Sequence, residues 1–179
     1  MSFDANEVAL WIWAEAKRQG ISMTHMKLQK LLYYAQAYSI GMTGEPLFHN
    51  TIMAWRHGPV VPDVYHSFSS FGNSVIQNVK NVTPPQPFDA LIAALVRNKG
   101  RLSAHELRNM THSESTWQNA WLHSQSHKIT EDMIAECFSH DFWTSDEEDD
   151  YQPSFDSQDE ENKFFKDIFN DEEINAILA

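Results

Sequence analysis

The chain has 179 residues, a formal net charge of −12, eleven phenylalanines and six tryptophans among 42% hydrophobic residues. This apolar content suffices for a packed core and excludes a wholly disordered chain. The acidic balance argues against non-specific nucleic-acid binding, because acidic side chains repel phosphate. The one cysteine, Cys137, excludes an internal disulfide bond.

The net charge belongs to one end of the chain. Residues 1–140 carry eleven acidic and eleven basic side chains, whereas residues 141–179 carry the other fourteen acidic groups and two lysines. A neutral body with an acidic extension follows. We predict a helical domain at residues 1–143, an acidic flexible linker at 144–162 and an amphipathic C-terminal segment at 163–179.

No signal for export or membrane insertion is visible. The first residues, Met1–Asp4, have neither a basic nor an apolar region of the kind found in a secretory signal. No apolar run approaches the roughly 20 residues that a membrane span needs. We therefore expect a cytoplasmic protein with no membrane partner.

Two helices are predicted before residue 45. Asp4 and Glu7 have the spacing of a capping box, which starts a helix that continues to Gln19 and stops at Gly20. The next helix carries one continuous apolar stripe at helical spacing, with two lysines off the stripe. The residues of the stripe are Leu28, Leu31, Leu32, Ala35, Tyr38 and Met42.

Residues 45–62 change character. Leu47-Phe48 and Thr51–Trp55 are short β-prone runs separated by two polar residues, which predicts a small hairpin. Arg56-His57-Gly58-Pro59 closes it, and Pro62 prevents a helix from running through.

The remaining body is predicted to be helical. A third helix follows from Asp63, and residues 73–86 form a polar loop. Further helices are expected around residues 88–99, 103–110, 116–123 and 130–142, each with an apolar face. The overall prediction is a mainly α protein: a compact single helical domain with at most one small β-hairpin near residues 45–56, plus the acidic C-terminal extension.

Two stretches resemble the Panacea domain of the SocA-like antitoxin family. The first comprises Lys27–Tyr38, the run Gly44-Glu-Pro-Leu-Phe48, and the run Ile52-Met-Ala-Trp55 followed by His57-Gly-Pro-Val-Val-Pro-Asp-Val-Tyr65. The second comprises Leu107-Arg-Asn-Met-Thr-His112 and Trp117-Gln-Asn-Ala120. The similarity covers about residues 5–143 and leaves the acidic extension outside it.

The resemblance implies a helical, non-enzymatic, cytosolic protein of bacterial or prophage origin. Members of the family neutralise a partner toxin by binding it, and the same domain is paired with toxins of unrelated folds. The expected partner is therefore a protein toxin. Besides solubility, the acidic extension has two interpretations: it folds back over a basic patch, or it mimics nucleic-acid phosphate toward a basic partner.

The turn Trp55-Arg56-His57-Gly58-Pro59, with Tyr65 shortly after it, is our candidate partner-binding surface. An aromatic, a guanidinium and a rigid turn favour binding because they bury area while losing little entropy. The alternative is that Gly58 and Pro59 only set a turn and Trp55 packs in the core. The second helix is a further candidate surface. Phe165 and Phe169, on the amphipathic end, are candidate contacts as well.

Catalysis and metal binding find little support. His123 and His127 are four residues apart, but their helix is expected to end between them and no carboxylate or cysteine stands at ligand spacing. Cys137 lies on an apolar stripe, where a thiol is inert. We predict no catalytic residue, no metal site and no cofactor.

Residues 100–121 superficially resemble a helix-turn-helix, but their excess of basic side chains is too small to bind DNA beside the acidic extension.

The leading hypothesis is a toxin-binding antitoxin. Two alternatives stay open. One is a phage or prophage accessory protein that inhibits a host nucleic-acid-handling enzyme through its acidic tail. The other is an adaptor for proteolysis, because the uncharged apolar C-terminus is of a kind that degradation machines grip.

Overall fold

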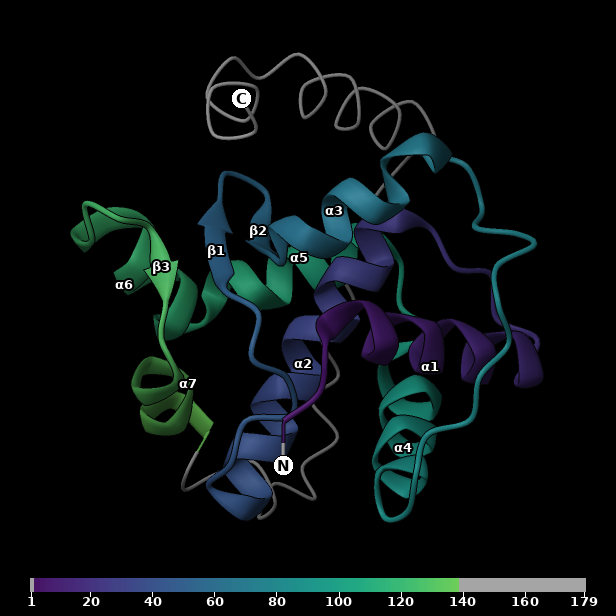
Figure 1. The fold of residues 1–179 in the computed structure, drawn as a ribbon. Helices are drawn as coiled ribbons and strands as arrows, with labels where there is room; N and C mark the ends of the chain where they lie inside the picture. Colours follow the sequence, from purple (N-terminus) through teal and green to yellow (C-terminus); the bar gives the residue numbers. More distant parts are fainter. Residues whose placement is uncertain (1, 139–179) are drawn as a thin grey trace. The chain divides into compact units, whose positions relative to one another are not determined.

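The computed structural model describes residues 2–138, which belong to one compact unit. Figure 1 shows helices packed around one long central helix, with a small sheet at one side. Within the described residues the helices are α1 (Ala5–Arg18), α2 (His25–Thr43), α3 (Pro62–Phe68), α4 (Phe88–Lys99), α5 (Ala104–Ser113), α6 (Ser115–His123) and α7 (Glu131–Phe138), and Ser69–Phe71 is a short 3-10 turn. None of these helices is both long and apolar enough to cross a membrane.

Side chains cap the starts of α1, α5 and α7. The Asp4 carboxylate accepts a hydrogen bond from the Asn6 amide at 2.8 Å and caps α1. Ser103 and Glu106 make a reciprocal capping box at the start of α5. Thr130 Oγ1 accepts from the Met133 amide at 3.2 Å at the start of α7. These contacts satisfy amides that have no partner inside the helix.

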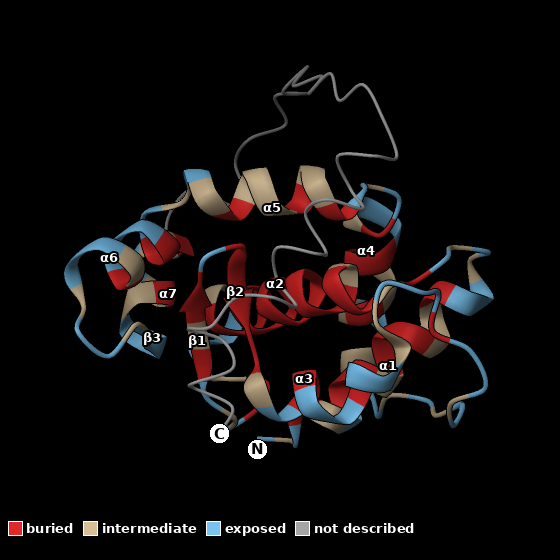
Figure 2. Ribbon diagram, turned by 90° about the horizontal axis from the view of Figure 1, so that it is seen from above, coloured by how far each residue is buried: buried red, intermediate tan, exposed pale blue. Residues whose placement is uncertain are grey.

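Helix α2 is the centre of the domain. Fifteen of its nineteen residues are buried, on every side of the helix, and α1, α4, α5, α7 and the hairpin pack around it. Figure 2 shows it buried along its length, with α5 on one side and α1 and α3 on the other. The expectation that this helix supplies a binding surface is therefore wrong, because its neighbours cover it.

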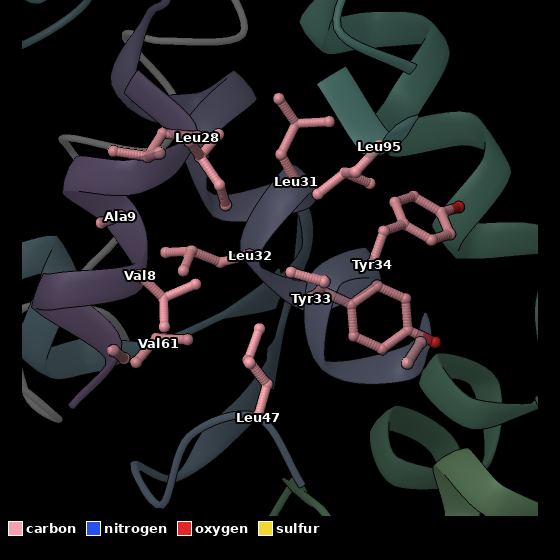
Figure 3. Close-up of a cluster of buried hydrophobic side chains, with 14 of the residues drawn as sticks. Val8, Ala9, Leu28, Leu31, Leu32, Tyr33, Tyr34, Leu47, Val61 and Leu95 are labelled. Carbon is pink, nitrogen blue, oxygen red and sulfur yellow. The ribbon is translucent and has the colours of Figure 1, made fainter. Parts of the chain in front are cut away.

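The core forms where α2 meets its neighbours. In Figure 3, Leu28 and Leu32 of α2 face Val8 and Ala9 of α1, and Leu31 lies beside Leu95 of α4. All six side chains are completely buried. Burying such side chains is the main favourable contribution to folding.

The sheet is small and antiparallel, in the order β2-β1-β3. Strand β1 (Ile52–Trp55) pairs with β2 (Gly58–Val60) across a tight turn and with β3 (Lys128–Ile129) on its other edge. The mainly α class with a small hairpin is confirmed, but the hairpin lies slightly later than its predicted arms, and β3 was not predicted.

The side chain of Gln36 explains why Leu47 and Phe48 are not a strand arm. Gln36 Oε1 accepts hydrogen bonds from the amides of Leu47 and Phe48 at 2.8 and 3.0 Å, and Gln36 Nε2 donates to the Phe48 carbonyl at 2.9 Å. A buried side chain of α2 thus takes the place of a partner strand. Phe48 retains one isolated bridge, to Phe3.

Candidate protein-binding site

The predicted contact residues of the turn lie at the tip of the β1–β2 hairpin and beside it. Trp55 ends β1, Gly58 and Pro59 begin β2, and Tyr65 is on α3. Trp55, His57 and Tyr65 are 4%, 8% and 9% exposed. Within the turn, Arg56 is the exposed residue. Arg56 is therefore the side chain of this turn that a partner can reach directly.

An aromatic layer supports the tip from inside. The Trp55 ring meets the Tyr65 ring edge-on, with centroids 5.1 Å apart, and Tyr65 lies 4.8 Å from the His25 ring of α2. Trp117 Nε1 of α6 donates to the Trp55 carbonyl at 2.9 Å. The end of β1 is thus held by packing and by a hydrogen bond from a distant helix.

Lys30 of α2 holds the first residues of β2. The side chain is completely buried, and Nζ donates to the Pro59 carbonyl at 2.9 Å. Gly58 lies against it with φ +107°, a conformation that favours glycine. A Cβ at Gly58 would stand 2.9 Å from Lys30 Nζ and from Thr111 Oγ1 of α5. A side chain at residue 58 would therefore crowd both helices and strain the backbone.

Gln29 holds the next residue of the chain. Its Oε1 accepts from the Val61 amide at 2.8 Å, and its Nε2 lies 3.3 Å from His25 Nε2. Burial, and then the charge of Lys30, lower the pKa of His25 to about 4. The histidine is therefore neutral at physiological pH and accepts from the Gln29 amide.

Basic side chains gather behind the tip. Burial, followed by the nearby charge of Arg108, lowers the pKa of Lys30 to about 7. Burial and then the Arg56 charge lower the pKa of Arg108, which is half-buried on α5. Burial, and then the charges of Arg108, Lys30 and His57, lower the pKa of His112 to about 3. We call Lys30, Arg56, Arg108 and His112 the basic cluster.

His112 has a fixed orientation within the cluster. Its ring stacks on the Trp117 indole with centroids 3.8 Å apart and planes within 9°. Trp117 in turn stacks on Trp121 at 5.8 Å. The column ties α5 to α6 and places His112 beside the hairpin.

A second polar cluster lies between α2 and α6. The Glu114 carboxylate accepts from Tyr33 Oη and Tyr34 Oη, both at 2.7 Å. Burial raises the pKa of Glu114, while the two tyrosines and Lys99 act in the opposite direction. Lys99 Nζ lies 4.6 Å from the centre of the Tyr34 ring. The Glu114 carboxylate therefore has hydrogen-bond partners within the domain.

The other sequence predictions fall elsewhere. His123 ends α6, whereas His127 follows it in a turn with φ +51°, so the two do not share a helical face. Cys137 is half-buried on α7. No group of three potential metal ligands occurs within residues 2–138. Phe165 and Phe169, like the linker 144–162, lie outside the described residues.

Sequence reasoning missed the residues that anchor the hairpin. Gln29 and Lys30 lie within the stretch Lys27–Tyr38, and Thr111 and His112 end the stretch Leu107–His112. Both stretches were singled out for their resemblance, but neither gave these side chains a role. One sequence feature could have pointed to them: polar residues occur inside both family motifs, where packing alone would favour apolar ones. The structure brings Lys30 and Thr111 of these motifs together at Gly58.

Comparison with known proteins gives one consistent result. The model of the family described as "Antitoxin SocA-like, Panacea domain" matches residues 28–118. The antitoxin SocA of Caulobacter vibrioides (strain NA1000 / CB15N) is 34% identical over 125 residues, which are 63% of this chain and 66% of the relative. The chain thus spans just under two thirds of that relative. No solved structure matches the chain.

Proposed function

The chain belongs to the SocA-like antitoxin family defined by the Panacea domain, and from this premise we propose that it is a non-enzymatic antitoxin that binds a toxin protein directly. The observation that carries the proposal is the family match over residues 28–118. A bacterial or prophage toxin–antitoxin pair acting in the cytoplasm is the setting that fits this role.

We assign different roles to the residues of the hairpin turn. Arg56 contacts the toxin, because it is the exposed member of the turn. Trp55, His57, Gly58 and Pro59 hold the tip in place, since they are buried beneath it. A guanidinium on a rigid support suits a binding hot spot, because little conformational entropy is lost on association.

The acidic extension has a separate role in this proposal. Its fourteen acidic side chains favour a toxin with a basic region, through charge complementarity that speeds and orients association. Phe165 and Phe169 remain proposed contacts within that extension.

The test begins with identification of the partner. The full chain is purified from its native host, and the proteins that come with it are identified by mass spectrometry. The captured protein is then expressed alone and together with the chain, and cell growth is measured. An antitoxin predicts growth arrest by the partner alone and rescue by the chain.

A matched pair of variants tests the role of Arg56. Arg56→Glu should abolish rescue and weaken binding. Arg101→Glu reverses the charge of an exposed arginine that precedes α5, away from the hairpin turn in the sequence, and should do neither. Equal rescue by both variants would contradict the assignment of Arg56.

The acidic extension also favours a second function, inhibition of a host nucleic-acid-handling enzyme. The same capture experiment separates the two. A non-toxic nucleic-acid enzyme, inhibited in vitro by the chain, would support the accessory-inhibitor function and contradict the antitoxin function.

A further inference from the structure

The segment that leads from α3 to α4 lies beside α1 without being hydrogen-bonded to it. Figure 1 shows this segment running past α1 on its way to α4. Within residues 2–138, the backbone of residues 77–84 makes no hydrogen bond. Most side chains of this stretch are exposed, whereas Val79 and Val82 are half-buried against the core. We call residues 77–84 the strap.

Both ends of the strap are fixed to the domain. Before it, Ile76 is buried, its amide donates to the Met23 carbonyl at 2.8 Å, and its carbonyl accepts from Trp13 Nε1 at 3.0 Å. After it, the Phe88 amide donates to the Pro85 carbonyl at 2.9 Å, where α4 begins. The strap can therefore open locally while the structure on either side of it stays folded.

The strap is also loosely packed. A surface cavity of about 630 Å³ lies between α1, α4 and residues 81–84, and another of about 380 Å³ lies between the end of α1 and residues 75–78. Where such a gap occurs, the atoms beside it lack partners for van der Waals contact. Opening the strap therefore costs the partial burial of Val79 and Val82 but breaks no backbone hydrogen bond.

The middle of the strap presents a bond that a protease can reach. Lys80 and Asn81 are exposed between the two half-buried valines. A protease binds an extended stretch of chain on both sides of the bond that it cuts, so both the exposure and the hydrogen bonding of the backbone decide where it acts. A lysine followed by asparagine suits a protease that recognises a basic side chain.

The other exposed basic residues of the described chain lie in hydrogen-bonded structure. Arg101 is in the connection from α4 to α5, where the Leu102 amide donates to the Lys99 carbonyl at 3.1 Å. The rest belong to helices or to the sheet: Lys17 and Arg18 in the last turn of α1, Arg97 in that of α4, Arg56 between β1 and β2, and Lys128 in β3. Cleavage at these positions requires helix, turn or strand contacts to break first.

A cut in the strap would leave the two parts of the domain in contact. The first part holds α1, α2, the β1–β2 hairpin and α3, and the second holds α4 to α7 and β3. Helix α2 packs against α4, α5 and α7, and β1 pairs with β3. Tyr33 and Tyr34 of the first part donate to Glu114 of the second, and Trp117 donates back to the Trp55 carbonyl. The two parts share one core.

The cut would change what the stability of the domain depends on. Segments joined by a short link meet at an effective concentration in the millimolar range, whereas separate fragments meet at their actual concentration. An intact chain unfolds with a midpoint that is independent of its concentration. A complex of two fragments loses stability on dilution.

We propose that the strap is an endoproteolytic cleavage site, cut between Lys80 and Asn81 by a protease that recognises basic residues, and that the cut chain persists as a folded complex whose stability depends on its concentration. Water adds across the amide, so the bond between the Lys80 carbonyl carbon and the Asn81 nitrogen breaks and leaves a carboxylate and an amino group. This inference goes beyond the proposed antitoxin function and does not depend on it.

Limited digestion with trypsin, followed by mass spectrometry, tests the site. Lys163→Gln and Lys166→Gln are present in every protein, so that trypsin does not cut the extension. The first cut within residues 2–138 should follow Lys80. Lys80→Gln should slow the first cut by about tenfold or more, whereas Arg101→Gln should leave its rate unchanged. A first cut after any other basic residue would overturn the proposal.

Further variants test whether the strap opens locally. Val82→Ala weakens an anchor and should speed cleavage after Lys80 by about threefold or more, whereas Val75→Ala changes an exposed valine outside the strap and should not. Gln36→Leu weakens the whole domain and should leave the rate unchanged. A rate that rises in Gln36→Leu in proportion to the lost stability would show that global unfolding exposes the bond, and the local site would be wrong.

The cut protein is then compared with the intact chain. Gel filtration at micromolar concentration should show both at the same elution volume, while a denaturing gel shows two fragments. Dilution by about tenfold should lower the urea midpoint of the cut protein and leave that of the intact chain unchanged. Fragments that separate on gel filtration, or a midpoint that ignores dilution, would overturn the folded complex.

Recovery of the chain from its native host tests cleavage in the cell. Mass spectrometry should find a fragment that begins at Asn81 in the wild type and none in Lys80→Gln. Absence of that fragment from the wild type would overturn the cleavage site as a feature used in the cell. Neither result bears on whether the captured partner is toxic, so the antitoxin function is judged separately.

Discussion

Lys30 and Pro59 meet inside the core, where the lysine ammonium donates to the proline carbonyl at 2.9 Å. Proline has no amide hydrogen, so its carbonyl is the polar backbone group of residue 59 that needs a partner. The central helix supplies that partner. The shape of the hairpin tip therefore depends on α2 as well as on pairing between its own strands.

The burial of Lys30, and then the charge of Arg108, make stability depend on pH in a defined window. The pKa of Lys30 falls from the ordinary value of 10.5 to about 7 on folding. Between these values the unfolded chain binds a proton that the folded chain lacks, so the free energy of unfolding rises as pH increases from about 7. Urea unfolding at pH 7, 8 and 9 should show this rise, at most about 1.4 kcal/mol per pH unit.

Lys30→Met removes the titrating group while keeping a long apolar stem, so the rise between pH 7 and 9 should flatten. Lys80→Met, which changes an exposed lysine, is the control and should keep the wild-type slope. Identical slopes in all three proteins would contradict the buried lysine as their source.

Gly58→Ala should be among the most damaging small substitutions in the domain. The added Cβ would stand 2.9 Å from Lys30 Nζ and Thr111 Oγ1, at a φ of +107°. Strain and overpacking together should cost about 3 kcal/mol or more. Gly20→Ala is the control, because Gly20 also has a positive φ but no atom within 4 Å of the new Cβ, and it should cost about 1 kcal/mol. Thermal or urea unfolding measures both, and equal losses would show that crowding at Gly58 is unimportant.

Gln36→Leu should destabilise the domain by about 3 kcal/mol or more, because it leaves the buried amides of Leu47 and Phe48 and the Phe48 carbonyl without their partner. Gln118→Leu is the control. That glutamine makes one exposed hydrogen bond, to the His112 carbonyl, and its loss should cost less than about 1 kcal/mol. Chemical unfolding compares the two, and a loss at Gln36 no larger than at Gln118 would count against this role.

His25 should make the domain sensitive to mild acid. Its pKa is about 4 in the folded chain against an ordinary 6.5, so between these values the unfolded chain binds a proton that the folded chain resists. The free energy of unfolding should therefore fall as pH drops from about 6.5 towards 4. His25→Phe keeps a ring against Tyr65 and should reduce this fall without removing it, since His112 titrates in the same direction. An unchanged fall in the variant would exclude His25 as a contributor.

The helices could be predicted because their signals are local. Asp4 and Ser103 cap helices through bonds to residues two or three positions away, and apolar spacing marks the faces. The hairpin could not be placed from local signals, since the partner of Leu47 and Phe48 is a side chain eleven or twelve residues earlier. Strand propensity predicted that Leu47 and Phe48 pair with a second strand, whereas their backbone groups bond to the Gln36 side chain instead.

The basic cluster was harder to predict for a similar reason. Apolar periodicity puts Lys30 off the stripe of α2, and such a position normally faces solvent. In the structure, however, α1, α3, α4, α5, α7 and the hairpin cover the helix on all sides. Arg108 and His112 are more than 75 positions away along the chain, so their proximity to Lys30 follows only from the packing of α5 on α2. Arg56 could be chosen from sequence because it stands in a turn, where exposure is the default.

Neutralising the acidic segment 146–150 should weaken binding of a basic partner without changing the body. The substitutions are Asp146→Asn, Glu147→Gln, Glu148→Gln, Asp149→Asn and Asp150→Asn in the full chain. Charge attraction between exposed groups is screened by salt, so the wild type should lose affinity steeply between about 50 and 200 mM salt and the variant much less. Binding is measured by calorimetry with the captured partner. Glu7→Gln with Glu45→Gln, two exposed acids of the body, is the control and should keep the wild-type salt dependence. If the five-fold variant binds with wild-type affinity and salt dependence, the extension is not what attracts the partner.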